Sequence, residues 1–248
     1  MKPTLFVSDL HLCASRPRIN RIFLDFLNDT AAHADALYVL GDLFEYWAGD
    51  DDLADPFNAG VIAALHSLSK RGVALYLMHG NRDFLIGRQF ADACGATLLP
   101  DPVIAGIDGV PTLLTHGDLL CTADRDYQDF RSKVRDPAWQ HAFLARPLAE
   151  RKAEIARLRE RSTREKGEKA DDIMDVTPSA VTALLRETGY PRLIHGHTHR
   201  PARHVHEIDG RRCERWVVRD WYDSGAHLRC DENGCVEVLL AQRYGTSN

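Results

Sequence analysis

The sequence has no long apolar run. No segment approaches the roughly 18 consecutive apolar residues that a membrane-spanning helix needs. The first residues, MKPTLFVSDLH, also lack the apolar core and the small-residue cleavage site of a secretory signal peptide. Both absences argue against an exported or membrane-spanning protein, and we expect the chain to stay in the cytoplasm.

Zinc-type cysteine pairs are missing as well. No CxxC spacing occurs among the six cysteines, which are Cys13, Cys94, Cys121, Cys213, Cys230 and Cys235. Because a reducing cytoplasm disfavours disulfides, we expect free thiols without a function. Cys230 and Cys235 flank the turn-like sequence DENG and could face each other across a hairpin, although two small apolar side chains are the simpler interpretation.

Positive charge is not in excess. The chain carries 31 Lys and Arg against 36 Asp and Glu, for a formal net charge of -5. General nucleic-acid binding requires a basic surface, so we expect no nucleic acid partner. The 248 residues, 44% hydrophobic and 27% charged, suit an ordinary globular protein with one large domain or a core domain carrying an insertion.

Short apolar runs alternate with helix-length amphipathic runs over the first hundred residues, a pattern typical of βαβ units. Residues 4–8, 36–40 and 74–78 are predicted to be buried strands. Residues 19–32 and 57–70 carry apolar side chains at three- and four-residue spacing, which predicts crossover helices. Asp83 can cap a third helix that ends near Gly95.

The second half of the sheet system shows a different pattern. Asp108-Gly109, Asp209-Gly210 and Asn233-Gly234 each separate two apolar runs, and such dipeptides mark β-hairpins. We therefore expect mainly antiparallel strands there, and two stacked sheets with helices outside.

Residues 122 to about 190 interrupt this pattern with helical sequence. From Arg125 to Lys169 there are 13 Lys and Arg against 8 Asp and Glu, so this stretch has a local net charge of +5. A solvated helical hairpin with mixed charge is the plainer interpretation. The more specific hypothesis is a lid that binds an anionic, lipid-like partner.

Five loops carry metal-ligand residues, and each follows an apolar run directly. The loops are SDLH (8–11), GDLFE (41–45), HGNRD (79–83), THGD (115–118) and HGHTH (195–199). The carboxyl ends of strands in an α/β sheet gather at one crevice, so these loops are expected to converge. A lone Asp or His at a strand end is usually a cap or a surface group, but five such loops in order indicate a metal site.

The spacing inside two of these loops suggests chelation. Asp9 and His11 are two residues apart, so in an extended segment their side chains leave on the same side, and His197 and His199 repeat this spacing. Oxygen and imidazole ligands without thiolates suit Mn, Fe, Zn or Mg, and the mixed set favours transition metals. The ion we expect is Mn²⁺.

The order D-x-H, GD, GN, H, GHxH resembles the calcineurin-like metallophosphoesterase superfamily. The stretches DLHLC, ALYVLGDLFEYWAGDD, HGNRDFL, THGDLLCT, IMDVTP and LIHGHTHRP, spread over nearly the whole chain, are similar to the UDP-2,3-diacylglucosamine diphosphatase family of lipid A biosynthesis. The superfamily usually has His after GN; Arg82 at this position is a feature of the lipid A enzymes.

The resemblance implies a fold and a domain organisation. The fold would be α/β, a four-layer αββα sandwich of two mixed sheets flanked by helices, with a helical insertion. Residues 1–121 and 190–248 would form the core. Residues 122–189 would form the insertion, a lid packed over the active site.

The resemblance also implies the residues of a dinuclear site. One of two divalent ions would bind Asp9, His11, Asp42 and His199, and the other Asp42, Asn81, His116 and His197, so that Asp42 bridges them. Asn81, Arg82 and His116 would be catalytic, with the Arg82 guanidinium facing the phosphoryl charge. For Arg82 alone, a surface salt bridge is the plainer alternative.

For the substrate, the resemblance implies hydrolysis of UDP-2,3-diacylglucosamine to UMP and 2,3-diacylglucosamine 1-phosphate, at the cytoplasmic face of the inner membrane. The expected substrate contacts are Asn81, Arg82, Asp124, Ser162, Lys166, Lys169 and His197. Without the resemblance, Ser162 and the two lysines are ordinary solvated helix residues.

Two alternatives remain open. One is a phosphoesterase acting on a soluble nucleotide or phosphoprotein, and the other is an inactive scaffold of the same fold, against which all seven filled ligand positions argue. His79 and His195 are either hydrogen-bonded supports of the ligands or plain buried histidines. The Asp50-Asp51-Asp52 run is interpreted as a loop and helix start, not as a third cation site.

Overall fold

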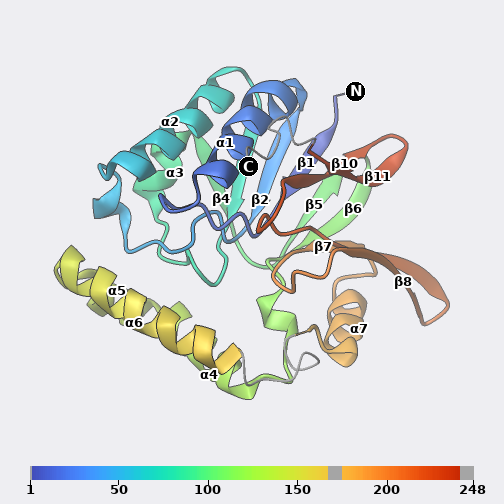
Figure 1. Ribbon diagram of the computed structural model, residues 1–248. Coiled ribbons are helices and arrows are strands. Elements are labelled where there is room, and N and C mark those ends of the chain that lie inside the picture. The colour runs from blue at the N-terminus through green and yellow to red at the C-terminus, as the bar shows by residue number, and fades with distance from the viewer. Residues whose placement is uncertain (1, 167–174, 241–248) are drawn as a thin grey trace, which may run out of the picture.

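The computed structural model describes residues 2–166 and 175–240, with backbone only for residues 161–166. Two mixed sheets are stacked, and helices cover both outer faces (Figure 1). The strand order is β11-β10-β1-β2-β3-β4 in the six-stranded sheet and β5-β6-β7-β9-β8 in the five-stranded sheet. This confirms the predicted α/β fold of two sheets flanked by helices.

The predicted strands of the first half are confirmed as β1, β2 and β3, which pair in parallel. A further strand, β4, was not predicted, because its sequence continues directly from the helix before it. The bounds of the strands are β1 Thr4–Val7, β2 Ala36–Leu40, β3 Ala74–Met78, β4 Ala96–Leu99, β5 Val103–Ile107, β6 Val110–Leu114, β7 Arg192–His195, β8 Ala202–Ile208, β9 Arg211–Val217, β10 Ala226–Asp231 and β11 Gly234–Leu239.

The predicted Asp-Gly hairpins are present, and both turn residues have positive φ, as the tight turn requires. Asp108 and Gly109 have φ of 50° and 76°, and Asp209 and Gly210 have φ of 52° and 72°. However, β7 pairs in parallel with both β6 and β9. The five-stranded sheet is therefore mixed. The expectation of a mainly antiparallel second half holds for the hairpins and for the pairing of β10 with β1, but not for β7.

Three helices cover the outer face of the six-stranded sheet. They are α1 (Pro17–Asp25), α2 (Pro56–Lys70) and α3 (Arg88–Cys94). The carboxylate of Asp55 accepts hydrogen bonds from the N–H groups of the first turn of α2, which begins with a proline, as helix starts favour. After α1 the chain stays helical, but passes through a π-helical turn and a 3₁₀ turn, so the predicted helix of residues 19–32 has an irregular second half.

Three apolar clusters fill the three interfaces between the four layers. Phe23, Phe26 and Trp221 belong to the largest, between the helices and the six-stranded sheet. Phe6, Leu40 and Ile194 lie between the two sheets. The third cluster includes Val181 and Leu185 of α7 (Pro178–Glu187), and packs α7 on the five-stranded sheet. Although α7 falls within the expected insertion 122–189, it forms the outer layer of the core.

The remaining insertion helices lie outside the four layers (Figure 1), but Phe143 belongs to the largest apolar cluster and Trp139 and Ile155 pack against it. These helices are α4 (Arg125–Arg135), α5 (Pro137–Leu144) and α6 (Leu148–Lys166). Within the ranges that the structure describes, no helix has the length and apolar character needed to cross a membrane.

Two local predictions are wrong. Asp83 does not cap α3, which begins after Gly87; instead, the carboxylate of Asp50 accepts hydrogen bonds from the N–H groups of Gly87 (2.9 Å) and Phe90 (3.0 Å). Cys230 and Cys235 are joined by a disulfide, although free thiols were expected. The two residues are direct partners across the β10–β11 hairpin, with Cα atoms 4.1 Å apart, so the fold brings their sulfur atoms within reach. The other four cysteines, all within the described ranges, form no disulfide.

A buried histidine of β10 predicts a pH dependence of stability. His227 is 3% exposed and packs against Phe26; burial, together with the charge of Arg229, lowers its pKa to about 4. Because an unfolded histidine titrates near a pKa of about 6.5, the stability contributed by neutral His227 is complete above that pH and is lost as pH falls towards 4.

We therefore expect His227→Gln to flatten the loss of unfolding free energy between pH 6.5 and 4. The slope of unfolding free energy against pH should decrease by at most about 1.4 kcal/mol per pH unit, the value for the uptake of one proton. Urea unfolding of the wild type and the variant across this pH range measures it. An unchanged slope would show that folding does not lower the pKa of His227.

Candidate metal centre

All five ligand loops come together at the carboxyl ends of β1, β2, β3, β6 and β7. Backbone hydrogen bonds join them: the N–H of Asp9 donates to the carbonyl of Gly41 (3.1 Å), and that of Gly196 to the carbonyl of His116 (2.9 Å). All seven predicted ligand residues lie in this cluster, which consists of Asp9, His11, Asp42, Asn81, His116, His197 and His199.

Five of these residues have left-handed backbone conformations. The φ angles are 54° for Asp9, 50° for His11, 52° for Asp42, 67° for His197 and 54° for His199. The expectation that the Asp-x-His and His-x-His pairs lie in extended segments is therefore wrong. Each such conformation costs about 1–3 kcal/mol in a non-glycine residue, and Asp and His tolerate it better than most. Strain concentrated in this way is typical of functional sites.

The ligand atoms form two overlapping groups. Those of Asp9, His11 and His199 lie within 4.8 Å of one another, and so do those of Asp9, Asp42 and His116. The two carboxylate oxygens of Asp42 face different sides: Oδ2 lies 3.8 Å from Nε2 of His11, and Oδ1 lies 3.9 Å from Nε2 of His116. Asp9 thus belongs to both groups, and the carboxylate of Asp42 lies between the imidazoles of His11 and His116.

Asn81 closes the second group. Its amide oxygen lies 3.1 Å from Nε2 of His116 and 3.0 Å from Nδ1 of His197. On the other side, Nε2 of His199 lies 3.3 Å from Oδ1 of Asp9, and the other oxygen of Asp9 accepts a hydrogen bond from the N–H of His197 (2.8 Å). In the 195–199 loop, His197 therefore lies beside Asn81 and the second group, and His199 belongs to the first group.

The donor set fits divalent cations. Asp9, His11, Asp42 and His116 are at most 2% exposed. Nε2 of His11 is buried without a hydrogen-bond partner among the described residues, and it faces the carboxylate of Asp42. A buried nitrogen of this kind calls for an explanation, and a cation shared with the carboxylate supplies one.

The electrostatics of the site favour positive charge. Burial alone would lower the pKa of His116, but the charges of Asp42, Asp9 and Asp118 raise it to about 9. Burial likewise opposes ionisation of Asp9, yet its hydrogen bond to His199 and the nearby imidazoles lower its pKa. A site that attracts protons in this way also attracts metal cations, which displace the protons when they bind.

Two glycines leave the space that the carboxylates occupy. A Cβ atom on Gly80 would lie 2.0 Å from Oδ1 of Asp42, and one on Gly196 would lie 2.3 Å from Oδ2 of Asp9. Any larger residue at either position would displace a ligand oxygen.

Asp83 supports the cluster in a way that the sequence did not reveal. Its fully buried carboxylate accepts hydrogen bonds from the N–H groups of Gly80 (2.8 Å), Leu43 (2.8 Å) and Asp42 (3.3 Å). It thereby ties the 41–45 loop to the 79–83 loop. Only its position beside Arg82 in the HGNRD motif could have pointed to it.

Asp118 is a second residue whose role was missed, and it attaches α4 to the rim of the site. Its buried carboxylate accepts hydrogen bonds from the hydroxyl of Tyr127 (2.7 Å) and from Nε of Arg131 (2.8 Å). The ring of Tyr127 stacks on His197, with ring centres 5.8 Å apart. The insertion therefore contacts a predicted ligand residue directly.

The predicted catalytic and substrate residues are described to different extents. The N–H of Arg82 donates to Oδ1 of Asp42 (2.8 Å), so this residue adjoins the cluster. Asp124 caps α4 by accepting a hydrogen bond from the N–H of Tyr127 (3.2 Å). Ser162 and Lys166 belong to α6, but their side chains lie outside the described residues, as does Lys169 entirely.

His79 and His195 support the loops by hydrogen bonding to backbone. Nε2 of His79 lies 2.7 Å from the carbonyl of Ile86, and Nδ1 of His195 lies 2.9 Å from the carbonyl of Gly196. Burial and the charge of Arg215 lower the pKa of His195 to about 4, so it stays neutral. Neither residue belongs to the ligand groups described above.

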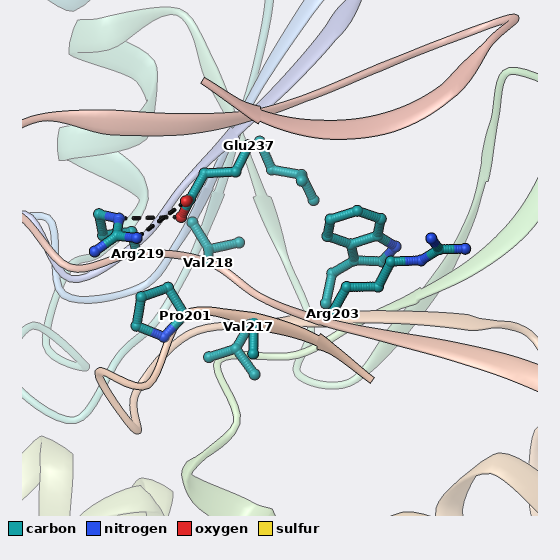
Figure 2. Close-up of a pocket in the computed structure, with 9 residues that line it drawn as sticks. Pro201, Arg203, Val217, Val218, Arg219 and Glu237 are labelled. Carbon is teal, nitrogen blue, oxygen red and sulfur yellow. Dashed lines mark hydrogen bonds and ion pairs between the residues drawn. The ribbon is translucent and has the colours of Figure 1, made fainter. Parts of the chain in front are cut away.

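A separate pocket lies between the β8–β9 and β10–β11 hairpins (Figure 2). Its charged groups are already paired: Arg219 donates two hydrogen bonds to Glu237 (3.1 and 3.0 Å), and Arg203 pairs with Glu214 and lies over the ring of Trp216. Because the side chains of Arg203 and Arg219 are both paired with carboxylates, we assign no part of the chemistry of the metal site to this pocket.

Comparison with known proteins agrees with this geometry. The calcineurin-like phosphoesterase family matches residues 2–201. A UDP-2,3-diacylglucosamine hydrolase of Aromatoleum aromaticum is 57% identical over 243 residues, covering 98% of this chain and 99% of that protein. The proteins of the same name from Cellvibrio japonicus and Xanthomonas campestris pv. campestris are 51% and 48% identical, over 93% and 96% of this chain and 96% and 99% of theirs. The chain thus belongs to the calcineurin-like phosphoesterase family, as a metal-dependent hydrolase of the UDP-2,3-diacylglucosamine hydrolase group.

Proposed function

We propose that this chain hydrolyses the diphosphate of UDP-2,3-diacylglucosamine, giving UMP and 2,3-diacylglucosamine 1-phosphate, a step of lipid A biosynthesis. The observation that carries the proposal is the convergence of seven buried or half-buried Asp, Asn and His residues from five loops. Relatives that cover nearly the whole chain carry the name of this activity.

We assign two divalent ions to the cluster. Asp9, His11, Asp42 and His199 would hold one, and Asp42, Asn81, His116 and His197 the other. Two ions in such a site lower the pKa of a bound water and stabilise charge at the reacting phosphorus. The mixture of carboxylate, amide and imidazole ligands without thiolate supports Mn²⁺ as the ion.

The residues around the cluster would bind and orient the diphosphate. The guanidinium of Arg82 would bind phosphoryl oxygens, because its planar fork suits two oxygen acceptors at once. Asn81 and His197 would contact the same phosphate from the side of α4, where Tyr127 holds the ring of His197 in place. Asn81, Arg82 and His116 are therefore our catalytic residues.

The insertion would bind the lipid part of the substrate. Each of its three helices exposes a large apolar side chain: Phe130 on α4, Leu144 on α5 and Leu158 on α6, each 39% exposed. Trp139 of α5 stacks on the buried ring of Phe143, with ring centres 4.9 Å apart, and so fixes this helix on the core. We assign the polar head group to Asp124, Ser162, Lys166 and Lys169, and place the protein as a peripheral enzyme on the cytoplasmic face of the inner membrane.

This division predicts different kinetics for the insertion and the core. We expect the double variant Leu144→Ser with Leu158→Ser to raise KM for the acylated substrate about thirtyfold, since each of the two lost apolar contacts removes roughly 1 kcal/mol of binding. Turnover of a small phosphodiester, bis-p-nitrophenyl phosphate, should not change. Val205→Ser, on exposed β8, is the control.

Equal loss of both activities would make the insertion a structural part of the catalytic core. The soluble-substrate alternative is tested by UDP-glucosamine without acyl chains: turnover equal to that of the lipid would favour it.

A further inference from the structure

We infer that Glu45 positions the ligand residue His11, and that Arg159 of the insertion holds Glu45, so that docking of α6 and metal binding stabilise each other. The carboxylate of Glu45 lies between the two. One of its oxygens is 3.2 Å from Nδ1 of His11, and the other forms an ion pair with the guanidinium of Arg159. This inference rests on the proposed role of His11 as a ligand.

The position of Glu45 is fixed by backbone pairing to the His11 loop. Leu12 and Phe44 form a short parallel bridge, and the N–H of Glu45 donates to the carbonyl of Leu12 (3.1 Å). The N–H of His11 in turn donates to the carbonyl of Asp42 (3.0 Å). The carboxylate is therefore held at one ring nitrogen of His11, while the other ring nitrogen faces Asp42.

This arrangement is what a metal-binding histidine needs. A carboxylate at one ring nitrogen fixes the ring orientation and the tautomer, and makes the opposite nitrogen a better ligand. At 3.2 Å the carboxylate oxygen lies close to this ring nitrogen, although the contact is not a linear hydrogen bond. Glu45 is only 15% exposed, so water competes little for its charge.

Arg159 reaches Glu45 because α6 is anchored earlier along its length. Arg151 is 1% exposed and binds the carbonyl of Ala48 and the carboxylate of Asp51, and Nζ of Lys152 lies 2.7 Å from Asp52. Eight residues further, about 12 Å along the helix, the guanidinium of Arg159 lies over the ring of Tyr46, 5.6 Å from its centre, and meets Glu45. The acidic 50–52 segment thus serves as a docking surface for the insertion.

The consequence is a linkage between two parts of the chain. If docked α6 favours the ion held by His11, that ion must favour docked α6 to the same degree. The second group does not include His11. The affinity for its ion should therefore not depend on whether α6 is docked.

The test is Mn²⁺ titration of the metal-stripped full chain by calorimetry, in the wild type and in Glu45→Gln, Arg159→Ala and the double variant. Glu45→Gln should weaken one of the two ions about 10–100-fold, the usual effect of removing such a support. Arg159→Ala should weaken the same ion by a smaller factor, and the double variant no more than Glu45→Gln. Arg157→Ala, an exposed arginine of the same helix, should have no effect.

Hydrogen exchange gives the reciprocal readout. Mn²⁺ should slow backbone exchange in residues 151–160 of the wild type, and this protection should be reduced in both single variants. Additive losses for Glu45→Gln and Arg159→Ala, or unchanged affinity in either, would overturn the inference. His11→Ala separates the two claims: if it leaves both ions bound, the ligand assignment itself is wrong.

Discussion

Asp42→Asn is expected to abolish turnover and to release metal from the chain. Asn keeps the size of the side chain and tolerates the positive φ of this position, so the change removes mainly the charge that lies between the two ligand groups. The metal ions would stabilise the transition state by several kcal/mol. Losing this stabilisation corresponds to a rate reduction of about a thousandfold or more.

Metal analysis by mass spectrometry and turnover of the UDP-lipid measure this prediction together. The fold should persist, since Asp42 contributes a buried charge rather than apolar packing, and circular dichroism provides that control. A variant that retains two tightly held ions and normal turnover would show that Asp42 does not bridge.

Arg82→Ala should reduce turnover by about 10²–10³-fold while both ions remain bound. A donor directed at developing charge in a site with little water is worth about 3–4 kcal/mol. Only the backbone N–H of Arg82 contacts Asp42, and Ala keeps that N–H, so the metal groups should be unaffected.

Arg82→Lys refines the measurement. Lysine retains the charge but not the planar fork, so it should recover only part of the lost rate. Near-normal turnover in Arg82→Ala, with the UDP-lipid as substrate, would instead make Arg82 a structural neighbour of the site.

The ligand residues could be predicted from the sequence because strand ends follow a simple rule. Apolar runs mark the strands, and polar residues directly after them gather at one edge of the sheet, so the positions of Asp9, Asp42 and His116 in the chain suffice to place them together. The chelating spacing of Asp9 and His11 led to the same cluster by incorrect reasoning, because their backbones are left-handed and not extended.

The supporting residues could not be predicted, because no motif or periodic pattern marks their partners, which lie from 9 residues away for Asp118 and Tyr127 to 114 residues away for Glu45 and Arg159. Asp83 looks like a helix cap, yet its carboxylate binds backbone N–H groups about 40 residues away. Glu45 and Asp118 look like ordinary acidic residues, and only the fold shows that they bind the insertion. Local patterns do not encode such contacts.

The Cys230–Cys235 disulfide illustrates a related limit. Spacing and the turn-like DENG sequence were compatible with a cross-strand pair, but the expected reducing compartment argued against a bond. The hairpin register, which places the two residues opposite each other, decides the proximity.

The most direct test of the account is product analysis with defined metal content. The metal-stripped chain should be inactive on UDP-2,3-diacylglucosamine, and activity should rise with Mn²⁺ until two ions are bound per chain. The products, separated by mass spectrometry, should then be UMP and 2,3-diacylglucosamine 1-phosphate in equal amounts. Full activity without added metal and with none bound, or UDP released intact from the lipid, would contradict a dinuclear centre that cleaves the diphosphate.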